Sequence, residues 1–203
     1  MHQKNNAIWS LAILFADLVL ASGTCFAQIR PYVGGGFGLP GMGFKSSYVG
    51  DVGVDLSVRR LLVEVEAGAD TGNKEDTGNG YTFRTHGLLM VRSTRPWLFG
   101  GGIHYSEVTT SVYQKHNRWP ILAAMYEKDS WRANLEYLLP GSDSRYNLTG
   151  PLLDLRIRLR GGLYWRQRLG AFVYRNPFEA NPSYHSGSEL DWTVVYVFHD
   201  RRE

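Results

Sequence analysis

The sequence contains one cysteine, Cys25, among 203 residues. A disulfide-bonded scaffold needs paired cysteines, so that class of fold is excluded. Long apolar runs are also missing, because after residue 27 no segment gives the roughly 18 consecutive apolar residues of a membrane-spanning helix. The formal net charge is only +3, which is too small and too mixed in sign to predict nucleic-acid binding. With 43% apolar and 13% aromatic residues, the chain is not disordered either.

The first 27 residues have the layout of a secretory signal peptide. Lys4 provides a basic start, residues 7–20 form a mostly apolar run, and small residues lead to Ala27. A membrane anchor and a lipoprotein acylated on Cys25 are the less favoured alternatives, since the apolar run is short and interrupted by a charge. Cleavage after Ala27 would leave residues 28–203 as a single cysteine-free domain, which suits an oxidising exported compartment.

The mature region alternates apolar and polar residues with a period of two. In residues 153–160, leucine or isoleucine occupies every odd position and aspartate or arginine every even one. Residues 61–70, 131–138 and 191–198 alternate in a similar way. Successive side chains of a strand point to opposite faces, so the pattern predicts an all-β fold. Ten strands are predicted, with eight as the alternative: 29–38, 47–58, 61–70, 80–92, 96–107, 119–128, 131–139, 151–160, 163–175 and 189–198.

The connections between these strands alternate in length. Short ones follow the second, fourth, sixth and eighth strands, as at residues 59–60 and 129–130, and long polar ones follow the others. Aromatic residues lie near many strand ends. Strands of about ten residues, with short turns on one side and long loops on the other, are typical of a closed transmembrane β-barrel.

Two further motifs strengthen this interpretation. The first mature strand reads Pro31-Tyr-Val-Gly-Gly-Gly-Phe-Gly38, and the last ends in the aromatic-rich run Trp192–Phe198. Together with the loop order, these motifs resemble the small outer-membrane β-barrel proteins of Gram-negative bacteria over residues 28–203. The resemblance implies outer-membrane localisation, short periplasmic turns, long extracellular loops, and contact with membrane lipid, lipopolysaccharide and the barrel assembly machinery. It implies a structural, loop-binding or narrow-pore role.

The polar faces of the strands are expected to line the interior. Charges inside a narrow barrel need partners, so we predict an ion-pair network between acidic strands two and three and basic strand eight with Arg132. Such side chains would favour a plug over an open pore. Glu127 shares a strand face with Trp119, Ile121, Ala123 and Met125, which is the wrong face for a carboxylate of a lipid-directed hydrolase. The candidates for the network are Glu64, Glu66, Arg84, Arg132, Glu136, Asp154, Arg156 and Arg158.

One motif has the residue types of acyl hydrolysis. His104-Tyr-Ser106 resembles the His-x-Ser element of outer-membrane lipid A deacylases, although Glu107 follows where that family tends to have asparagine. Strand parity places His104 and Ser106 in the lumen, away from lipid, so no catalytic residue is predicted and the hydrolase remains an alternative. A soluble periplasmic β-barrel binding an apolar ligand is the third possibility. The six histidines lack ligand spacing, so neither a metal nor a cofactor is predicted.

Overall fold

The computed structural model describes residues 28–39, 47–74, 78–94, 96–110, 114–141, 148–175 and 183–198. The predicted signal peptide lies outside these residues. The described chain forms ten strands: β1 (Gln28–Leu39), β2 (Ser47–Val58), β3 (Leu61–Lys74), β4 (Gly78–Arg92), β5 (Trp97–Thr110), β6 (Gln114–Lys128), β7 (Trp131–Leu138), β8 (Leu148–Arg160), β9 (Leu163–Arg175) and β10 (Tyr184–Val197).

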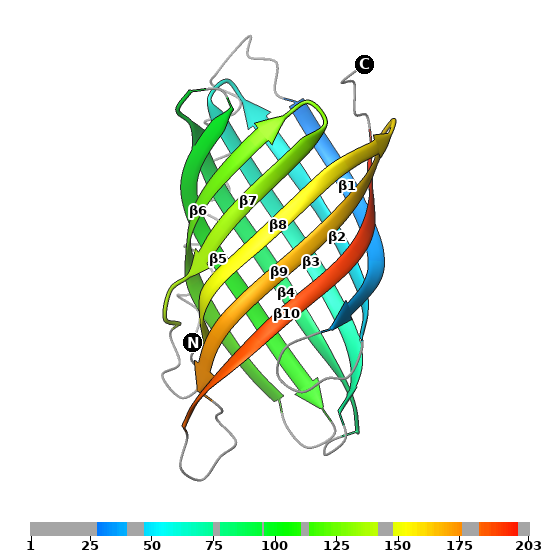
Figure 1. Ribbon diagram of the computed structural model, residues 1–203, viewed down its shortest axis with the longest axis vertical. Helices are drawn as coiled ribbons and strands as arrows, with labels where there is room; N and C mark the ends of the chain where they lie inside the picture. The colour runs from blue at the N-terminus through cyan, green and yellow to red at the C-terminus, as the bar shows by residue number, and fades with distance from the viewer. Residues whose placement is uncertain are drawn as a thin grey trace, which may run out of the picture.

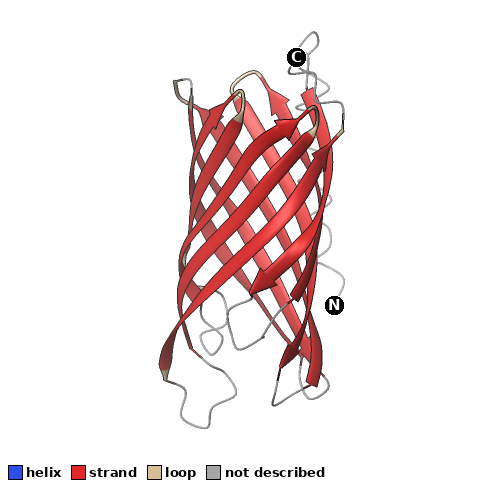
Figure 2. Cartoon of the chain, turned by 45° about the vertical axis from the view of Figure 1, so that its right-hand side comes forward, coloured by secondary structure: helices blue, strands red, loops and turns tan. Residues whose placement is uncertain are grey.

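The ten strands close into one antiparallel barrel. Each strand pairs with its neighbours in sequence, and β1 pairs with β10 to complete the wall (Figure 1). The prediction of an all-β, ten-stranded closed barrel is therefore confirmed, and the eight-stranded alternative is wrong. The strands run obliquely to the barrel axis, with the short turns gathered at one end (Figure 2). We call this the short-turn end, and the opposite one the long-connection end. Three of the connections there have 7 to 9 residues, but the predicted long connections after the third and fifth strands are wrong. The strands continue into those polar segments, so only three residues separate β3 from β4 and β5 from β6. Among the described residues, no helix is long and apolar enough to span a membrane.

The barrel wall is apolar outside and polar inside. In β3, the side chains of Glu64 and Glu66 point inward and are only 1% and 2% exposed, whereas Val65 between them is 50% exposed on the outer face. The alternation of side chains repeats this arrangement in β7 and β8, whereas β4 to β6 also carry apolar side chains such as Met90, Leu98 and Met125 on the inner face. Large exposed aliphatic residues form the outer band: Ile29, Val33, Val52, Val65, Leu89, Val91, Ile103, Leu122, Leu135, Leu159, Leu163, Leu169, Val173 and Val194.

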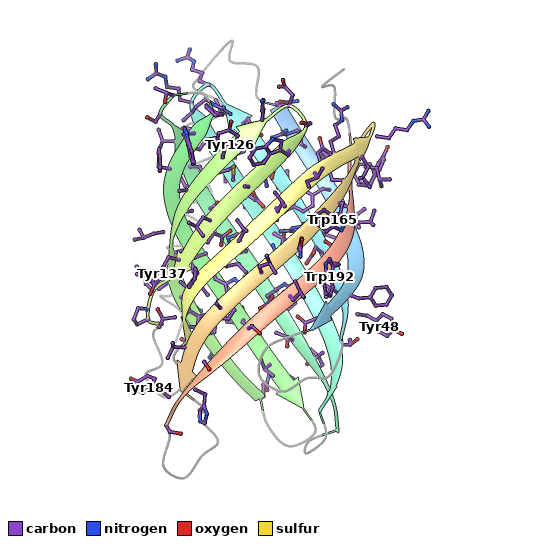
Figure 3. All side chains as sticks on the ribbon, viewed as in Figure 1. Tyr48, Tyr126, Tyr137, Trp165, Tyr184 and Trp192 are labelled. Carbon is purple, nitrogen blue, oxygen red and sulfur yellow. The ribbon has the colours of Figure 1, made fainter. Side chains whose placement is uncertain are left out.

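Aromatic rings bound this outer band. Near the short-turn end, the ring of Tyr126 lies 5.0 Å from that of Trp97 and 4.8 Å from that of Trp131, centroid to centroid. Further toward the long-connection end, the rings of Phe37 and Tyr48 lie 5.5 Å apart. Figure 3 shows Tyr126 near the short turns and Tyr48 well below it. The exposed apolar surface is therefore a belt between two aromatic rims.

The orientation of β6 is set by its neighbours. Trp119, Ile121 and Met125 point into the barrel and are at most 3% exposed, while Leu122 is 58% exposed outside. Both faces of β6 are apolar, so its sequence carries no polar marker to show which face is inward. The register with β5 and β7 decides the orientation. Glu127 also lies inside, where it pairs with arginine side chains.

Glycines in β1 allow the seam with β10 to close. A Cβ added to Gly36 would lie 1.9 Å from the carbonyl oxygen of Trp192, whereas one added to Gly50 of β2 would meet no atom within 4 Å. The glycines of residues 34–38 thus belong to a strand that approaches its neighbour closely, and not to a phosphate-binding loop.

Replacing Gly36 with alanine is expected to destabilise the barrel by about 1–3 kcal/mol, because the seam must shift to admit the methyl group. Gly50→Ala is the matched control and should leave stability unchanged within about 0.5 kcal/mol, since its methyl group enters open space. Thermal unfolding of the two refolded variants in detergent would compare them. Equal melting temperatures would contradict a tight seam.

Candidate functional site: the ion-pair network inside the barrel

Two carboxylates of β3 reach across the lumen to the opposite wall. Glu64 Oε1 lies 2.6 Å from Arg156 Nη2 of β8, and Glu66 Oε2 lies 2.7 Å from Arg166 Nη1 of β9. Glu66 also pairs with Arg168 of β9. All five side chains are at most 6% exposed. Because β3 is not adjacent to β8 or β9 in the barrel, these ion pairs cross the lumen and do not join neighbouring strands.

Asp154 and Tyr32 complete the centre of the network. The Nε of Arg166 donates to both carboxylate oxygens of Asp154 at 3.0 Å, and its Nη2 donates at 2.5 Å. The hydroxyl of Tyr32 donates to Glu66 at 2.8 Å. The guanidinium of Arg156 lies 4.7 Å from the centroid of the Tyr32 ring, within cation–π range. These contacts supply many of the hydrogen bonds that buried charges require.

A second group of ion pairs lies toward the short-turn end. Arg132 of β7 donates to Asp55 at 2.9 Å and to Glu64 at 2.5 Å. Arg30 of β1 lies 3.5 Å from both Asp55 and Glu127. Glu64 therefore joins this group to the central one, and both form one network.

Arg84 of β4 is surrounded by four carboxylates. Its Nη atoms lie 3.3 Å from oxygens of Asp51, Asp70, Asp191 and Glu189, which come from β2, β3 and β10. The side chain of Glu189 is 27% exposed, whereas the other three carboxylates are almost fully buried. Arg166 contacts Asp51 at 3.4 Å and so connects Arg84 to the centre of the network.

Glu136 of β7 has partners of its own. His86 Nε2 of β4 lies 3.1 Å from its Oε2, and the amide nitrogen of Asn134 donates to its Oε1 at 2.6 Å. Glu136 and Asn134 are at most 3% exposed, and His86 is 6% exposed. This contact bridges β4 and β7 across the interior.

Two apolar clusters also lie inside the described barrel on the β3–β9 side. One cluster, from β3 to β6, includes Leu62, Met90, Leu98 and Met125, residues near the short turns. The other contains Trp119, Leu138, Leu152 and Phe172, which come from β6 to β9. Charged and apolar side chains together pack the middle of the barrel, as expected for a barrel this narrow.

Seven of the eight predicted network residues take part in these contacts. The eighth, Arg158, lies at the short-turn end, where its Nε donates to the carbonyl oxygen of Gly161 at 2.8 Å. There β8 reaches the rim of the barrel, and a bulge interrupts its pairing with β9.

Sequence analysis missed Arg166 and Arg168. The strand that carries them was the least regular of the ten, with mixed residues on both faces. Their spacing of two, in phase with Tyr164 and Gly170, was the available signal for an inward-facing pair. Asp70, Asp191 and Tyr32 were also missed, since nothing in a single sequence shows which distant carboxylate an arginine meets.

His104 and Ser106 both face the lumen. The His104 ring lies 6.1 Å from the ring of His86 and 5.7 Å from that of Trp119, and Ser106 is 8% exposed. Both lie on the opposite face of β5 from Phe99 and Ile103, which belong to the outer belt. A hydrolase acting on lipid acyl chains would need them outside, so this geometry does not favour the hydrolase.

No protein-family model matches the chain, and no curated protein matches it. In the part of the chain that the structure describes, no group of three or more His, Cys, Asp or Glu residues is placed to hold a metal ion. Function is therefore inferred from the wall and the interior of the barrel.

Proposed function

We propose that the protein is an outer-membrane β-barrel with a closed interior, which acts as a structural anchor for its long connections and not as an open pore. The observation that carries this proposal is the polarity of the wall. A belt of exposed aliphatic residues between aromatic rims surrounds an interior of buried ion pairs. A soluble barrel has the opposite polarity, since it must bury its apolar side chains away from water.

The backbone arrangement supports the same proposal. Hydrocarbon cannot satisfy unpaired backbone N–H and C=O groups, so a sheet inside a membrane must close on itself. Here β1 and β10 close the wall, and every strand except the eight-residue β7 has 12 to 15 residues, which is enough to cross a bilayer at a tilt. In this proposal the belt contacts lipid, and lipopolysaccharide packs around the outer leaflet side.

Export and orientation follow from the same proposal. Residues 1–27 would direct secretion and be removed near Ala27, and the aromatic end of β10 would be read by the barrel assembly machinery. The short turns would then lie in the periplasm and the long connections outside the cell. Those connections offer the surface through which the protein would bind a partner.

The cross-lumen contacts favour a closed barrel over a pore. Glu64, Glu66 and Asp154 meet Arg156, Arg166 and Arg168 in the middle of the lumen. Water and solute could pass only if several buried ion pairs separated together. Breaking one such pair costs about 3–5 kcal/mol when a charge is left without its partner.

Two measurements on the refolded full chain would test the proposal. We expect the protein to need detergent or lipid to stay monodisperse, and to migrate differently on a gel before and after boiling. In planar bilayers we expect no steady conductance. A chain that remains monodisperse in plain buffer would contradict the membrane assignment. Stable open channels would contradict the closed interior while leaving the membrane assignment intact.

A further inference from the structure

The short-turn end of the barrel carries a concentration of positive charge. Three two-residue turns and the strand ends beside them place Arg59, Arg60, Lys128 and Arg160 at the surface, all exposed. Arg158 lies close by, with its Nε on the Gly161 carbonyl. We call these five residues the basic rim. Its exposed carboxylate is Asp129, the turn residue after Lys128.

Other acidic groups near this end are already engaged inside the barrel. Glu127 turns inward, where Arg92 lies 2.8 Å and Arg30 3.5 Å from its carboxylate. Asp55 likewise pairs with Arg132 within the lumen. These inward carboxylates therefore do not neutralise Arg60, Lys128 and Arg160 at the described rim.

The basic rim lies directly beside the end of the apolar belt. Arg160 follows Leu159, which is 58% exposed, and Lys128 lies between Tyr126 and Trp131 along the chain. The turns that supply the cations join β2 to β3, β6 to β7 and β8 to β9, so the charges are spread around the barrel. If the belt lies in lipid, these side chains reach the depth of the headgroups.

We propose that the basic rim binds the phosphodiester headgroups of anionic phospholipids in the leaflet next to the short turns. This inference rests on the proposed function and extends it by naming a lipid class. Arginine donates two hydrogen bonds to a phosphate in a planar fork, and each cation near an anionic surface adds attraction. A ring of cations that borders an apolar belt is complementary to a lipid leaflet, whose acyl chains would face the belt and whose anionic headgroups would face the cations.

Quenching of tryptophan fluorescence by brominated lipids tests the proposal, because Trp97 and Trp131 lie near the basic rim. The refolded full chain is reconstituted into phosphatidylcholine vesicles that contain brominated phosphatidylglycerol or brominated phosphatidylcholine. At low salt we expect stronger quenching by phosphatidylglycerol, with a preference of about fivefold for each cation engaged. High salt should reduce this preference, since it screens exposed charges.

The informative variant replaces Arg59, Arg60, Lys128 and Arg160 with glutamine. We expect it to fold and insert in phosphatidylcholine like the unmodified chain, and to lose the preference for phosphatidylglycerol. A single-charge comparison provides the matched control. Arg160→Gln should weaken the preference, whereas Arg118→Gln, at an exposed position of β6 far from the short turns, should not.

The outcomes separate this inference from the proposed function. Insertion with equal quenching by the two lipids would contradict the binding of anionic lipid by the basic rim, and so would a preference that survives in the fourfold variant. Either result would leave the membrane assignment of the barrel intact. Failure of the unmodified chain to enter either vesicle would overturn the membrane assignment and this inference with it. Retention of a DNA fragment by the rim, combined with equal quenching, would identify a different polyanion and overturn the lipid assignment.

Discussion

Replacing Arg166 with methionine is expected to destabilise the folded barrel by about 3–5 kcal/mol. The Arg166 side chain is 1% exposed and contacts three carboxylates, with Asp154 at 2.5 Å, Glu66 at 2.7 Å and Asp51 at 3.4 Å. Methionine fills part of the space but carries no charge, so these carboxylates lose their shared cation while remaining buried. Uncompensated buried charge is among the most costly defects in a protein interior.

Urea unfolding of the refolded variants, followed by heat-modifiable gel migration, would measure this effect. Arg160→Met is the matched control, because it makes the same substitution at an exposed site and should change stability by less than about 0.5 kcal/mol. Adding Asp154→Asn to Arg166→Met should restore part of the loss, since it removes one of the stranded charges. Similar unfolding midpoints for Arg166→Met and Arg160→Met would show that the network does not stabilise the barrel.

The fold was predictable because apolar and polar residues alternate along many of the strands, and this alternation identifies the two faces. In β3, β7, β8 and β10, charged or polar residues occupy every second position over most of the strand, and period two then fixes which side chains share a face. The alternation of short and long connections adds the antiparallel order. These signals are local in sequence, so a single chain is enough to reveal them.

The structure adds most where the local signal is ambiguous. β6 has apolar residues on both faces, so only its register against β5 shows that Trp119 points inward. Arg158 follows the alternation of β8 and lies at the short-turn end, where its Nε donates to the Gly161 carbonyl oxygen. Polarity identifies a face, and depth along the barrel decides which partners a residue on that face meets.

The partners of the network depend on long-range geometry. Arg84 meets Asp191, 107 positions later in the chain, only because β10 returns to close the barrel against β1. Sequence patterning predicts that charges lie inside and that they need partners. Which acid meets which base follows from strand tilt and register around the whole wall, and neither can be read from one segment.

The structure adds an expectation for Arg156. From the sequence, Arg156→Ala is expected to be milder for membrane insertion than a charge on the lipid face, since it alters the lumen. In the structure, Arg156 lies 2.6 Å from Glu64 and against the Tyr32 ring, so its loss should weaken the folded barrel. Arg156→Ala should therefore lower the free energy of unfolding of the barrel, which is a different effect from impaired insertion into lipid.

Replacing the neighbouring Leu155 with arginine is expected to impair membrane assembly for a different reason. Leu155 points outward from β8, between Ala133 of β7 and Gln167 of β9, within the apolar belt. A charge on the lipid face near the middle of the bilayer costs about 2–4 kcal/mol. In water the same surface arginine would cost almost nothing, so the variant also separates a membrane barrel from a soluble one.

Assembly yield in lipid vesicles, scored as the heat-modifiable fraction, would measure the Leu155 effect. Leu155→Met is the matched control, since it keeps the outer face apolar at similar volume and should assemble like the unmodified chain. Leu155→Arg should assemble less in vesicles yet refold well in a detergent micelle, whose surface lets a long side chain reach water more easily. Equal vesicle yields for the two variants would mean that lipid does not cover this face. That result would contradict the assignment of the apolar outer face to the membrane.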